Sequence, residues 1–333
     1  MKYIENDLTN KKILITGGAG FIGSNLAFYF QQNHPKAKVT VLDIFRTEAT
    51  FSNGNLKSFG HFKNLLGFSG EVRQGDINDA DVIAKLLEEG YDYIFHEAAI
   101  SDTTVLDQAL MIATNVNAFK SLLDIAIASN AAMIYASSAA TYGNAPSPQT
   151  VGKEAPENVY GFSKLMMDNI AYEYRERFPK ATIVGLRYFN VYGAREYFKN
   201  TTASMVLQFG LQILKGNAPR LFEGSDKILR DFIYIEDVIQ ANVKAMAGAS
   251  GVYNVGTALP RSFQDIADIL QKVLGVDYGN EYIKNPYTAY QTFTQADIQT
   301  TAKALGYAPR FSLEEGIAAY IDEIKRITKE ELS

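Results

Sequence analysis

The sequence predicts an α/β fold, a Rossmann-type doubly wound parallel sheet joined to a smaller C-terminal lobe. Over residues 12–189, short apolar runs alternate with stretches of helical apolar spacing, a pattern typical of parallel strands covered by helices on both faces. The segment GGAGFIG (17–23) stands between the first apolar run and the first helical stretch, where nucleotide-binding folds turn from strand to helix. Beyond residue 190 the strand-like runs lose their regular spacing, which indicates a second lobe.

The elements follow in chain order. We expect strands at 12–16, 39–43, 71–77, 91–99, 132–138 and 182–189, and helices at 21–32, 79–89, 104–130 and 159–177. In the second half we expect helices near 202–215, 236–248, 262–274 and 312–327. Ser262 followed by Asp265 is typical of a helix N-cap. Segment 230–238 again has the pattern of a strand and then a helix. We therefore assign residues 1–189, with 230–256 returning to them, to the Rossmann domain, and 190–229 and 257–333 to the second lobe.

Composition excludes several classes of protein. The 333 residues contain no cysteine, which excludes disulfides, thiolate metal sites and a cysteine nucleophile. The three histidines, His34, His61 and His96, lack metal-ligand spacing, so no metal site is expected. The net charge of −5 is unlike the basic excess of nucleic-acid binders. We see no secretory signal and no run of 18 apolar residues, and so expect a cytoplasmic protein without membrane contact.

The glycine segment predicts a dinucleotide site. Gly17, Gly20 and Gly23 suit a tight turn whose backbone approaches a pyrophosphate, and the helix that begins at Phe21 and Ile22 offers free N–H groups to phosphates. Asp43, 20 residues past Gly23 at the end of the next strand, is placed to bind an adenosine ribose.

Further positions along the strand ends fit the same ligand. Asp76, after the third strand, could receive the adenine amino group or could serve the following turn, where Asn78 and Asp79 compete for the helix cap. The small residues Ala98 and Ala99 end the fourth strand, and they leave room for a cofactor ribose against the backbone.

Tyr160 and Lys164 are the candidate catalytic pair. Their i, i+4 spacing at the start of a predicted helix places both side chains on one face. A neighbouring ammonium lowers the pKa of a tyrosine, which is roughly 10 when unperturbed. Ser138, at the end of the fifth strand, can hydrogen-bond a substrate hydroxyl, so the three residues predict a proton relay beside a hydride acceptor. The alternative is an ordinary pair on the surface of a helix.

These motifs resemble the extended short-chain dehydrogenase/reductase family, whose members act mainly on nucleotide sugars. The resemblance is carried by GGAGFIG (17–23), HEAA (96–99), YASSAATYG (135–143), NVYGFSK (158–164) and RYFNVYG (187–193). Segments 187–199, 221–238 and 290–298 are similar to the ADP-glyceromanno-heptose 6-epimerase branch of that family. The resemblance implies an epimerase of lipopolysaccharide core biosynthesis that acts on ADP-D-glycero-β-D-manno-heptose. It also implies a tightly bound NADP or NAD in each subunit, and a homo-oligomer, in that branch a pentamer.

The resemblance assigns roles residue by residue. It implies two acid/base groups, Tyr160 and Lys199, because the C6 hydroxyl points in different directions in the two epimers; taken alone, Lys199 has the features of a surface lysine. Implied cofactor contacts, beside those above, are Ile44, Arg46, Ile77, Glu97, Ser101, Asn115 and Val191. Implied substrate contacts are Ser138, Asn190, Thr201, Gln208, Phe222, Glu223, Gly224, Ser225, Arg230 and Tyr290. Arg230 resembles a diphosphate ligand, and Asn115 has the alternative of a helix-surface amide.

Three departures leave questions open. Thr201 stands where the family has serine, and Gln208 where some relatives have histidine. Segment 44–70 is longer than a simple connection and rich in aromatic residues. Asp43 alone favours NAD, whereas Arg46, and in that segment Lys57 or Lys63, could pair with the additional phosphate of NADP.

Two other functions compete with this interpretation. A 4,6-dehydratase of the family would carry Asp-Glu after Thr141, where this chain has Tyr142 and Gly143; a 4-epimerase stays open. A nucleotide-sensing module that is not an enzyme would keep the glycines and lose the Tyr160–Lys164 pair.

Overall fold

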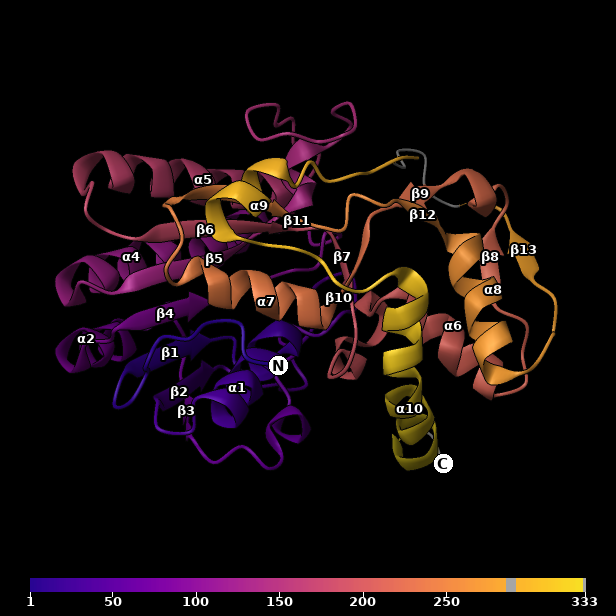
Figure 1. The fold of residues 1–333 in the computed structure, drawn as a ribbon, viewed down its shortest axis with the longest axis horizontal. Helices are drawn as coiled ribbons and strands as arrows, with labels where there is room; N and C mark the ends of the chain where they lie inside the picture. Colours follow the sequence, from indigo (N-terminus) through magenta and orange to yellow (C-terminus); the bar gives the residue numbers. More distant parts are fainter. Residues whose placement is uncertain (286–291, 332–333) are drawn as a thin grey trace.

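The computed structural model describes residues 1–285 and 292–331. Its main feature is a seven-stranded parallel sheet with the order β11-β6-β5-β4-β1-β2-β3 (Figure 1). The strands are β1 (Lys12–Thr16), β2 (Lys38–Asp43), β3 (Glu71–Gln74), β4 (Tyr93–His96), β5 (Ala132–Ser138), β6 (Ile183–Tyr188) and β11 (Gly251–Val255). The predicted Rossmann-type fold is therefore confirmed.

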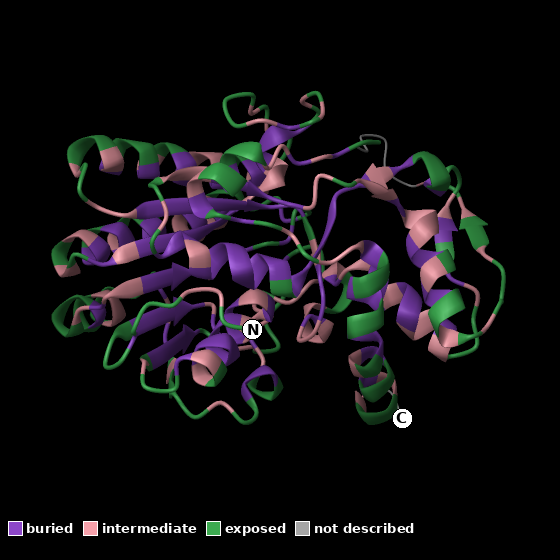
Figure 2. Ribbon diagram, in the orientation of Figure 1, coloured by how far each residue is buried: buried purple, intermediate pink, exposed green. Residues whose placement is uncertain are grey.

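Helices cover both faces of this sheet because its strands carry apolar residues on both sides. Ile13 and Ile15 of β1 join a core with α1 (Phe21–Asn33) and α7 (Ile235–Ala245). Leu14, between them, points to the other face and joins a core with α2 (Ala80–Glu89), α4 (Ala118–Ser129) and α5 (Val159–Arg177). Figure 2 shows the central strands of the sheet buried and the outer faces of these helices exposed.

The strand order reverses between β1 and β4. The chain runs from β1 outward to β2 and β3, and then crosses to β4 on the other side of β1, where Thr16 pairs with His96. Open parallel sheets bind ligands beyond the carboxyl ends of the strands at such a point. The glycine turn after Thr16 and the wall segment after His96 therefore face one crevice.

The second lobe contains short paired strands and helices that lie beside the main sheet (Figure 1). The pairs are β7 (Asn190–Tyr192) with β10 (Phe232–Tyr234), β9 (Leu229–Arg230) with β12 (Arg261–Ser262), and β8 (Arg220–Phe222) with β13 (Glu281–Ile283). Helices α6 (Met205–Leu214), α8 (Phe263–Leu274) and α10 (Leu313–Glu331) pack together. Short 3₁₀ segments lie at η1 (Phe62–Leu65), η3 (Ala139–Tyr142), η4 (Tyr197–Thr202, kinked at Asn200) and η5 (Ser225–Lys227).

Most expected elements match the structure, with informative exceptions. The expected helix at 104–130 is divided into α3 (Gln108–Met111), a π-helical stretch (Ile112–Asn117) and α4. The short helix α9 (Gln299–Leu305) was missed, since seven residues give little periodicity. Ser262 and Asp265 do form a capping box. In segment 230–256, β11 pairs with β6 in the main sheet, whereas β10 pairs with β7 outside it; the domain boundaries stay a prediction.

One helical stretch, Gln108–Ser129, is long and apolar enough to cross a membrane by length and composition. Half of its most apolar window is buried inside the fold, where α4 packs against α2 and α5. Its apolar side chains are those of a core helix.

Candidate active site

A cavity of about 460 Å³ lies beyond the carboxyl ends of β1, β2, β4 and β5. It brings together many of the residues singled out from the sequence, namely Gly17, Gly20, Phe21, Ile22, Gly23, Asp43, Ile44, Lys57, Asp76, Ile77, Glu97, Ala98, Ala99, Ser101, Ser138, Tyr160, Lys164, Val191 and Lys199. Segments that are far apart in sequence thus form one concave site, as is typical of a ligand site in a doubly wound sheet.

The glycine turn is shaped by close backbone approaches. Gly17 has φ of +67°, and a Cβ there would lie 2.6 Å from the Ala98 backbone nitrogen. A Cβ on Gly23 would lie 2.4 Å from the Gly17 carbonyl oxygen. Gly20 is the N-cap of α1 and brings no capping side chain, so the first N–H groups of this 13-residue helix are available at the cavity. This cradle fits a dinucleotide diphosphate.

Asp43 is 5 % exposed and holds the turn together. Its Oδ2 accepts from the Ala19 backbone N–H at 3.0 Å and its Oδ1 from that of Phe45 at 2.8 Å. Burial raises the pKa of Asp43, and these backbone hydrogen bonds act in the opposite direction. The residue lines the cavity as expected, but it also has a local role that the sequence did not reveal.

Asp76 lines the cavity and is not the cap of α2. Its Oδ1 accepts from the Asn78 backbone N–H at 2.8 Å, while Asp79 caps the helix by accepting from Asp81 and Val82. Of the candidates for this cap, Asp79 is therefore the one that caps α2, and Asp76 lies at the cavity wall.

Asn115 is fully buried, and the alternative of a helix-surface amide is wrong. Its side chain exchanges two hydrogen bonds with the Ile100 backbone and donates to Ser163 Oγ at 3.0 Å. It does not line the cavity; it holds the wall segment 97–101 against α5 from behind.

Tyr160 and Lys164 lie at the start of α5, facing the cavity. Asn158 caps the helix by accepting from the Gly161 N–H, and the lack of a side chain at Gly161 lets the helix approach the Ala140 carbonyl. The Lys164 Nζ donates to the Ala136 carbonyl at 2.8 Å and lies 5.9 Å from the centroid of the Tyr160 ring. Lys164 is 2 % exposed, so the alternative of a surface pair is wrong.

Burial shifts the pKa values of both residues toward their neutral forms. Burial lowers the pKa of Lys164 to about 8, while the carboxylates of Glu97 and Asp168 act to raise it. Burial raises the pKa of Tyr160, and a hydrogen bond with Ser138 acts to lower it. A lysine poised near neutrality beside a tyrosine is typical of acid–base sites.

Glu97 is a titratable group whose state the sequence did not predict. It lines the cavity beside Lys164, and burial raises its pKa to about 7. The Tyr188 hydroxyl, at the end of β6, donates to its Oε1 at 2.9 Å. Its carboxyl is therefore more readily protonated than that of an exposed glutamate.

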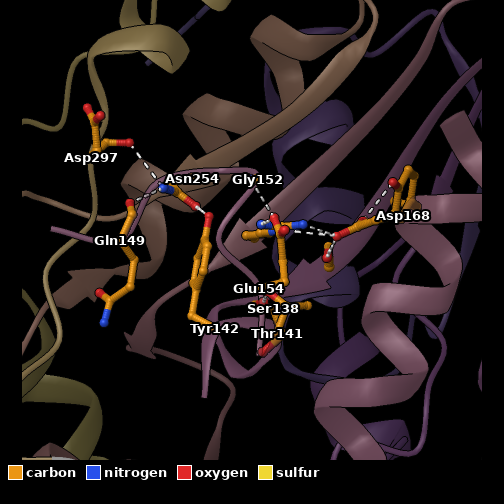
Figure 3. A network of polar contacts seen from close by, with 12 residues as sticks. Ser138, Thr141, Tyr142, Gln149, Gly152, Glu154, Asp168, Asn254 and Asp297 are labelled. Carbon is orange, nitrogen blue, oxygen red and sulfur yellow. Dashed lines mark hydrogen bonds and ion pairs between the residues drawn. The ribbon is translucent and has the colours of Figure 1, made fainter. Parts of the chain in front are cut away.

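A buried polar network holds α5 to the sheet (Figure 3). Asp168, one turn beyond Lys164, accepts from Tyr135, Ser137 and Arg187, the last at 2.8 Å. Arg187 is 2 % exposed and also pairs with Glu154. Sequence reasoning missed Asp168, although its i, i+4 spacing from Lys164 was a signal.

Lys199 reaches the cavity from a different part of the chain. It lies in η4, and its Nζ is 5.6 Å from the centroid of the Phe21 ring. Burial lowers the pKa of Lys199, and Glu196 acts to raise it. Because Lys199 is half-buried and lines the cavity, the alternative of an ordinary surface lysine is wrong.

Of the three cations considered in segment 44–70, one lines the cavity and two do not. Arg46 does not line the cavity, because its Nη2 donates to the Phe198 carbonyl at 2.9 Å. Lys63 pairs with Glu331 at 2.7 Å, away from the cavity. Lys57 does line it.

The expected substrate residues of the second lobe do not line this cavity; these are Asn190, Thr201, Gln208, Phe222, Glu223, Gly224, Ser225 and Arg230. Thr201 donates to Asn55 Oδ1 at 3.0 Å, and Gln208 donates to the Thr201 and Ala203 carbonyls. Arg230 is 7 % exposed, with its guanidinium 5.9 Å from the Phe263 ring centroid. Tyr290 lies outside the described residues.

The fold and the site define a class of nicotinamide-nucleotide enzyme. The model of the NAD dependent epimerase/dehydratase family matches residues 13–256, and the chain belongs to this family.

Several solved structures of epimerases are similar to this chain in sequence and in fold. The chain is 53 % identical to the ADP-L-glycero-D-manno-heptose-6-epimerase of Helicobacter pylori over 98 % of this chain and 99 % of that one, with a TM-score of 0.90. It is 27 % identical to the UDP-glucose 4-epimerase of Thermotoga maritima, over 96 % and 100 % of the two chains, with a TM-score of 0.83. It is also 27 % identical to the UDP-glucuronic acid 4-epimerase of Bacillus cereus, solved with UDP-glucuronic acid and NAD, over 95 % and 99 %, with a TM-score of 0.80.

Proposed function

We propose that this chain epimerises ADP-D-glycero-β-D-manno-heptose to the L-glycero epimer at C6, for lipopolysaccharide core synthesis. The observation that carries the proposal is that Tyr160 and Lys199, from different segments, line one cavity together with the glycine turn. Inverting a carbinol centre through a ketone requires a proton partner for the hydroxyl in each of its two orientations. The similarity to the Helicobacter pylori enzyme supports the choice of sugar nucleotide.

The residues of the cavity divide the chemistry between them. A bound nicotinamide nucleotide supplies a hydride acceptor and donor for C6. Tyr160 accepts the hydroxyl proton of one epimer, and Ser138 hydrogen-bonds the same oxygen. Lys164 stabilises the phenolate through its charge. Lys199 exchanges the proton of the other epimer after the ketone has turned in the site.

The glycine cradle and the strand ends fit the cofactor. The N–H groups at the start of α1 would hold its diphosphate, Asp43 and Ile44 its adenosine ribose, and Asp76 and Ile77 its adenine. Glu97, Ala98, Ala99, Ser101 and Val191 would form the wall around the nicotinamide half. Asn115 would support that wall without contact.

We propose NADP rather than NAD. Of the three cations considered for its additional phosphate, Lys57 lines the cavity, whereas Arg46 and Lys63 do not. Because hydride returns to the same sugar, the cofactor need not leave between turnovers. Denaturing the purified protein and identifying the released nucleotide tests both points; release of NAD alone would contradict the NADP choice, and absence of any nucleotide would contradict tight retention.

The second lobe is proposed to bind the sugar nucleotide. Arg230 would pair with its diphosphate, since guanidinium groups bind such anions bidentately. Asn190, Thr201, Gln208, the loop 222–225 and Tyr290 would contact the rest of the substrate. These groups must approach the cavity by closure of the lobe or by extension of the ligand beyond it. We also expect a cytoplasmic homo-oligomer, as a pentamer.

Incubation of the purified chain with ADP-D-glycero-β-D-manno-heptose, followed by NMR at C6, tests the function. Appearance of the L-glycero epimer without added nucleotide is expected. UDP-glucose and dTDP-glucose serve as parallel substrates, because a 4-epimerase or a 4,6-dehydratase would convert one of them instead. Conversion of either, with ADP-heptose unchanged, would overturn the proposal.

A further inference from the structure

The loop that presents Lys199 is closed by one buried carboxylate. Glu196 is 0 % exposed. Its Oε1 accepts from the Gly193 N–H at 3.1 Å and from the Ser204 hydroxyl at 2.7 Å, and its Oε2 accepts from the Ser204 N–H at 2.7 Å. Gly193 enters the loop and Ser204 leaves it as the N-cap of α6. The side chain of Glu196 therefore joins both ends of the segment 193–204.

The backbone of this loop needs such support. Arg195 has φ of 72° and Asn200 has φ of 52°, both in the left-handed region that costs a residue with a side chain free energy. Lys199 lies directly before Asn200, and its N–H donates to the Glu196 carbonyl at 2.9 Å. Strained residues persist where the surrounding structure holds them, and here Glu196 supplies contacts from both its backbone and its side chain.

Glu196 also acts on Lys199 through its charge. Among the described residues, Glu196 is the charged side chain that raises the pKa of the Lys199 ammonium. The titratable groups that face Glu196 from other elements are the phenols of Tyr192 on β7 and Tyr320 on α10. Burial raises the pKa of Glu196, while Lys199 and the hydrogen bonds from Gly193 and Ser204 act to lower it. Lys199 is therefore the positively charged group whose charge acts on Glu196.

We propose that Glu196 is the positioning residue of the second acid/base group. Its carboxylate closes the 193–204 loop and fixes a negative charge beside Lys199, and so sets both where the ammonium lies and how readily it releases its proton. This inference rests on the proposed function for its catalytic meaning, but the effect on Lys199 can be measured without a sugar.

The distinguishing variant is Glu196→Gln, which keeps the size of the side chain and removes the charge. Without that charge, the pKa of Lys199 should fall by about one unit or more. The limb of the pH–rate profile that depends on Lys199 should move to lower pH in both reaction directions, because it reports the same ammonium. Glu196→Asp, whose carboxylate retreats by one methylene, should give an intermediate shift. Glu176→Gln, at an exposed position of α5, makes the same change in net charge and should shift nothing.

Acylation of the Lys199 amine as a function of pH, read by mass spectrometry, gives the same quantity without substrate. The midpoint should fall in the order wild type, Glu196→Asp, Glu196→Gln. If Glu196→Gln does not fold by circular dichroism, wild type against Glu196→Asp decides the question. Equal midpoints overturn the inference. A shifted midpoint in a protein that does not convert ADP-heptose would instead overturn the proposed function and leave the positioning role in place.

Discussion

Tyr160 and Lys199 reach the same cavity from supports of different kinds. Tyr160 stands in the first turn of α5, a regular 19-residue helix with a side-chain cap and a buried ion pair one turn beyond Lys164. Lys199 stands in a 3₁₀ segment next to a left-handed Asn200, held by the side chains of Glu196 and Arg46. Each base also has at least one buried acid near it, Glu97 and Asp168 for the Tyr160–Lys164 pair and Glu196 for Lys199.

The difference separates two ways of placing a reactive group. A regular helix places a side chain by local rules, so its position survives changes elsewhere. An irregular loop places a side chain through individual side-chain contacts, some of them to residues distant in sequence such as Arg46, so its position depends on each of those contacts. We therefore expect substitutions in the residues that support Tyr160 to lower the stability of the fold. Substitutions in the residues that support Lys199 should instead lower activity in a protein that stays folded.

The largest effect is expected from removing each base. Tyr160→Phe and Lys199→Met should each lower the rate of epimerisation by about 10²–10⁴-fold, the usual contribution of a general acid or base. Circular dichroism and the content of bound nucleotide should stay as in the wild type. Each variant should retain partial redox chemistry with one epimer only, visible as absorbance of the reduced nicotinamide. Wild-type turnover by Lys199→Met would refute the two-base comparison.

The next effect concerns stability on the Tyr160 side. Asp168→Asn removes one of the two carboxylate partners of the buried Arg187 guanidinium and leaves Glu154 as the other, and breaking such a buried pair costs about 3 kcal/mol of unfolding free energy. Urea unfolding at fixed protein concentration measures the loss. Arg326→Gln, which removes exposed pairs with Glu323 and Glu330, should cost less than about 1 kcal/mol. Equal losses in the two variants would show that the network does not anchor α5.

The third effect is a pH dependence from Glu97. Burial raises its pKa in the folded protein to about 7 from an ordinary value of 4.5. The folded state thus keeps this proton where the unfolded state has lost it, and the stability that results declines as pH rises through about 7. Glu97→Gln carries no titrating proton there. Between pH 5 and 8 its free energy of unfolding should therefore fall by roughly 1–3 kcal/mol less than that of the wild type. Parallel stability curves for the two proteins would show that Glu97 is already ionised at pH 5.

The sequence predicted the residues that regular strands, turns and helices place, and it missed residues that irregular segments or tertiary contacts place. The glycine turn, Asp43, Tyr160 and Lys164 obey rules of strand, turn and helix spacing, and all of them line the cavity. Arg46 was expected at the cofactor, but it supports Phe198 instead, because no local rule says which way a loop side chain turns. Asn55 and Asp168 were missed, since their partners are brought close by tertiary packing. Glu196 was missed although its partners Gly193 and Ser204 are near in sequence, because no spacing rule describes an irregular loop.

The smallest effect tests whether segment 44–70 supports the Lys199 side. Asn55 accepts from Thr201, two residues beyond Lys199, and donates to Asp102 on the opposite wall at 2.8 Å. Asn55→Ala removes both hydrogen bonds, each worth about 1 kcal/mol, and frees one end of η4. Turnover should fall by a few-fold to about tenfold, with the loss confined to the step that depends on Lys199.

Asn144→Ala is the matched control, because it removes an exposed amide that contacts Glu157 on the Tyr160 side. Rate constants for the two half-reactions, from the absorbance of reduced nicotinamide after mixing with each epimer, separate the cases. An equal slowing of both half-reactions would mean that Asn55 shapes the whole cavity, and that the two bases share a support.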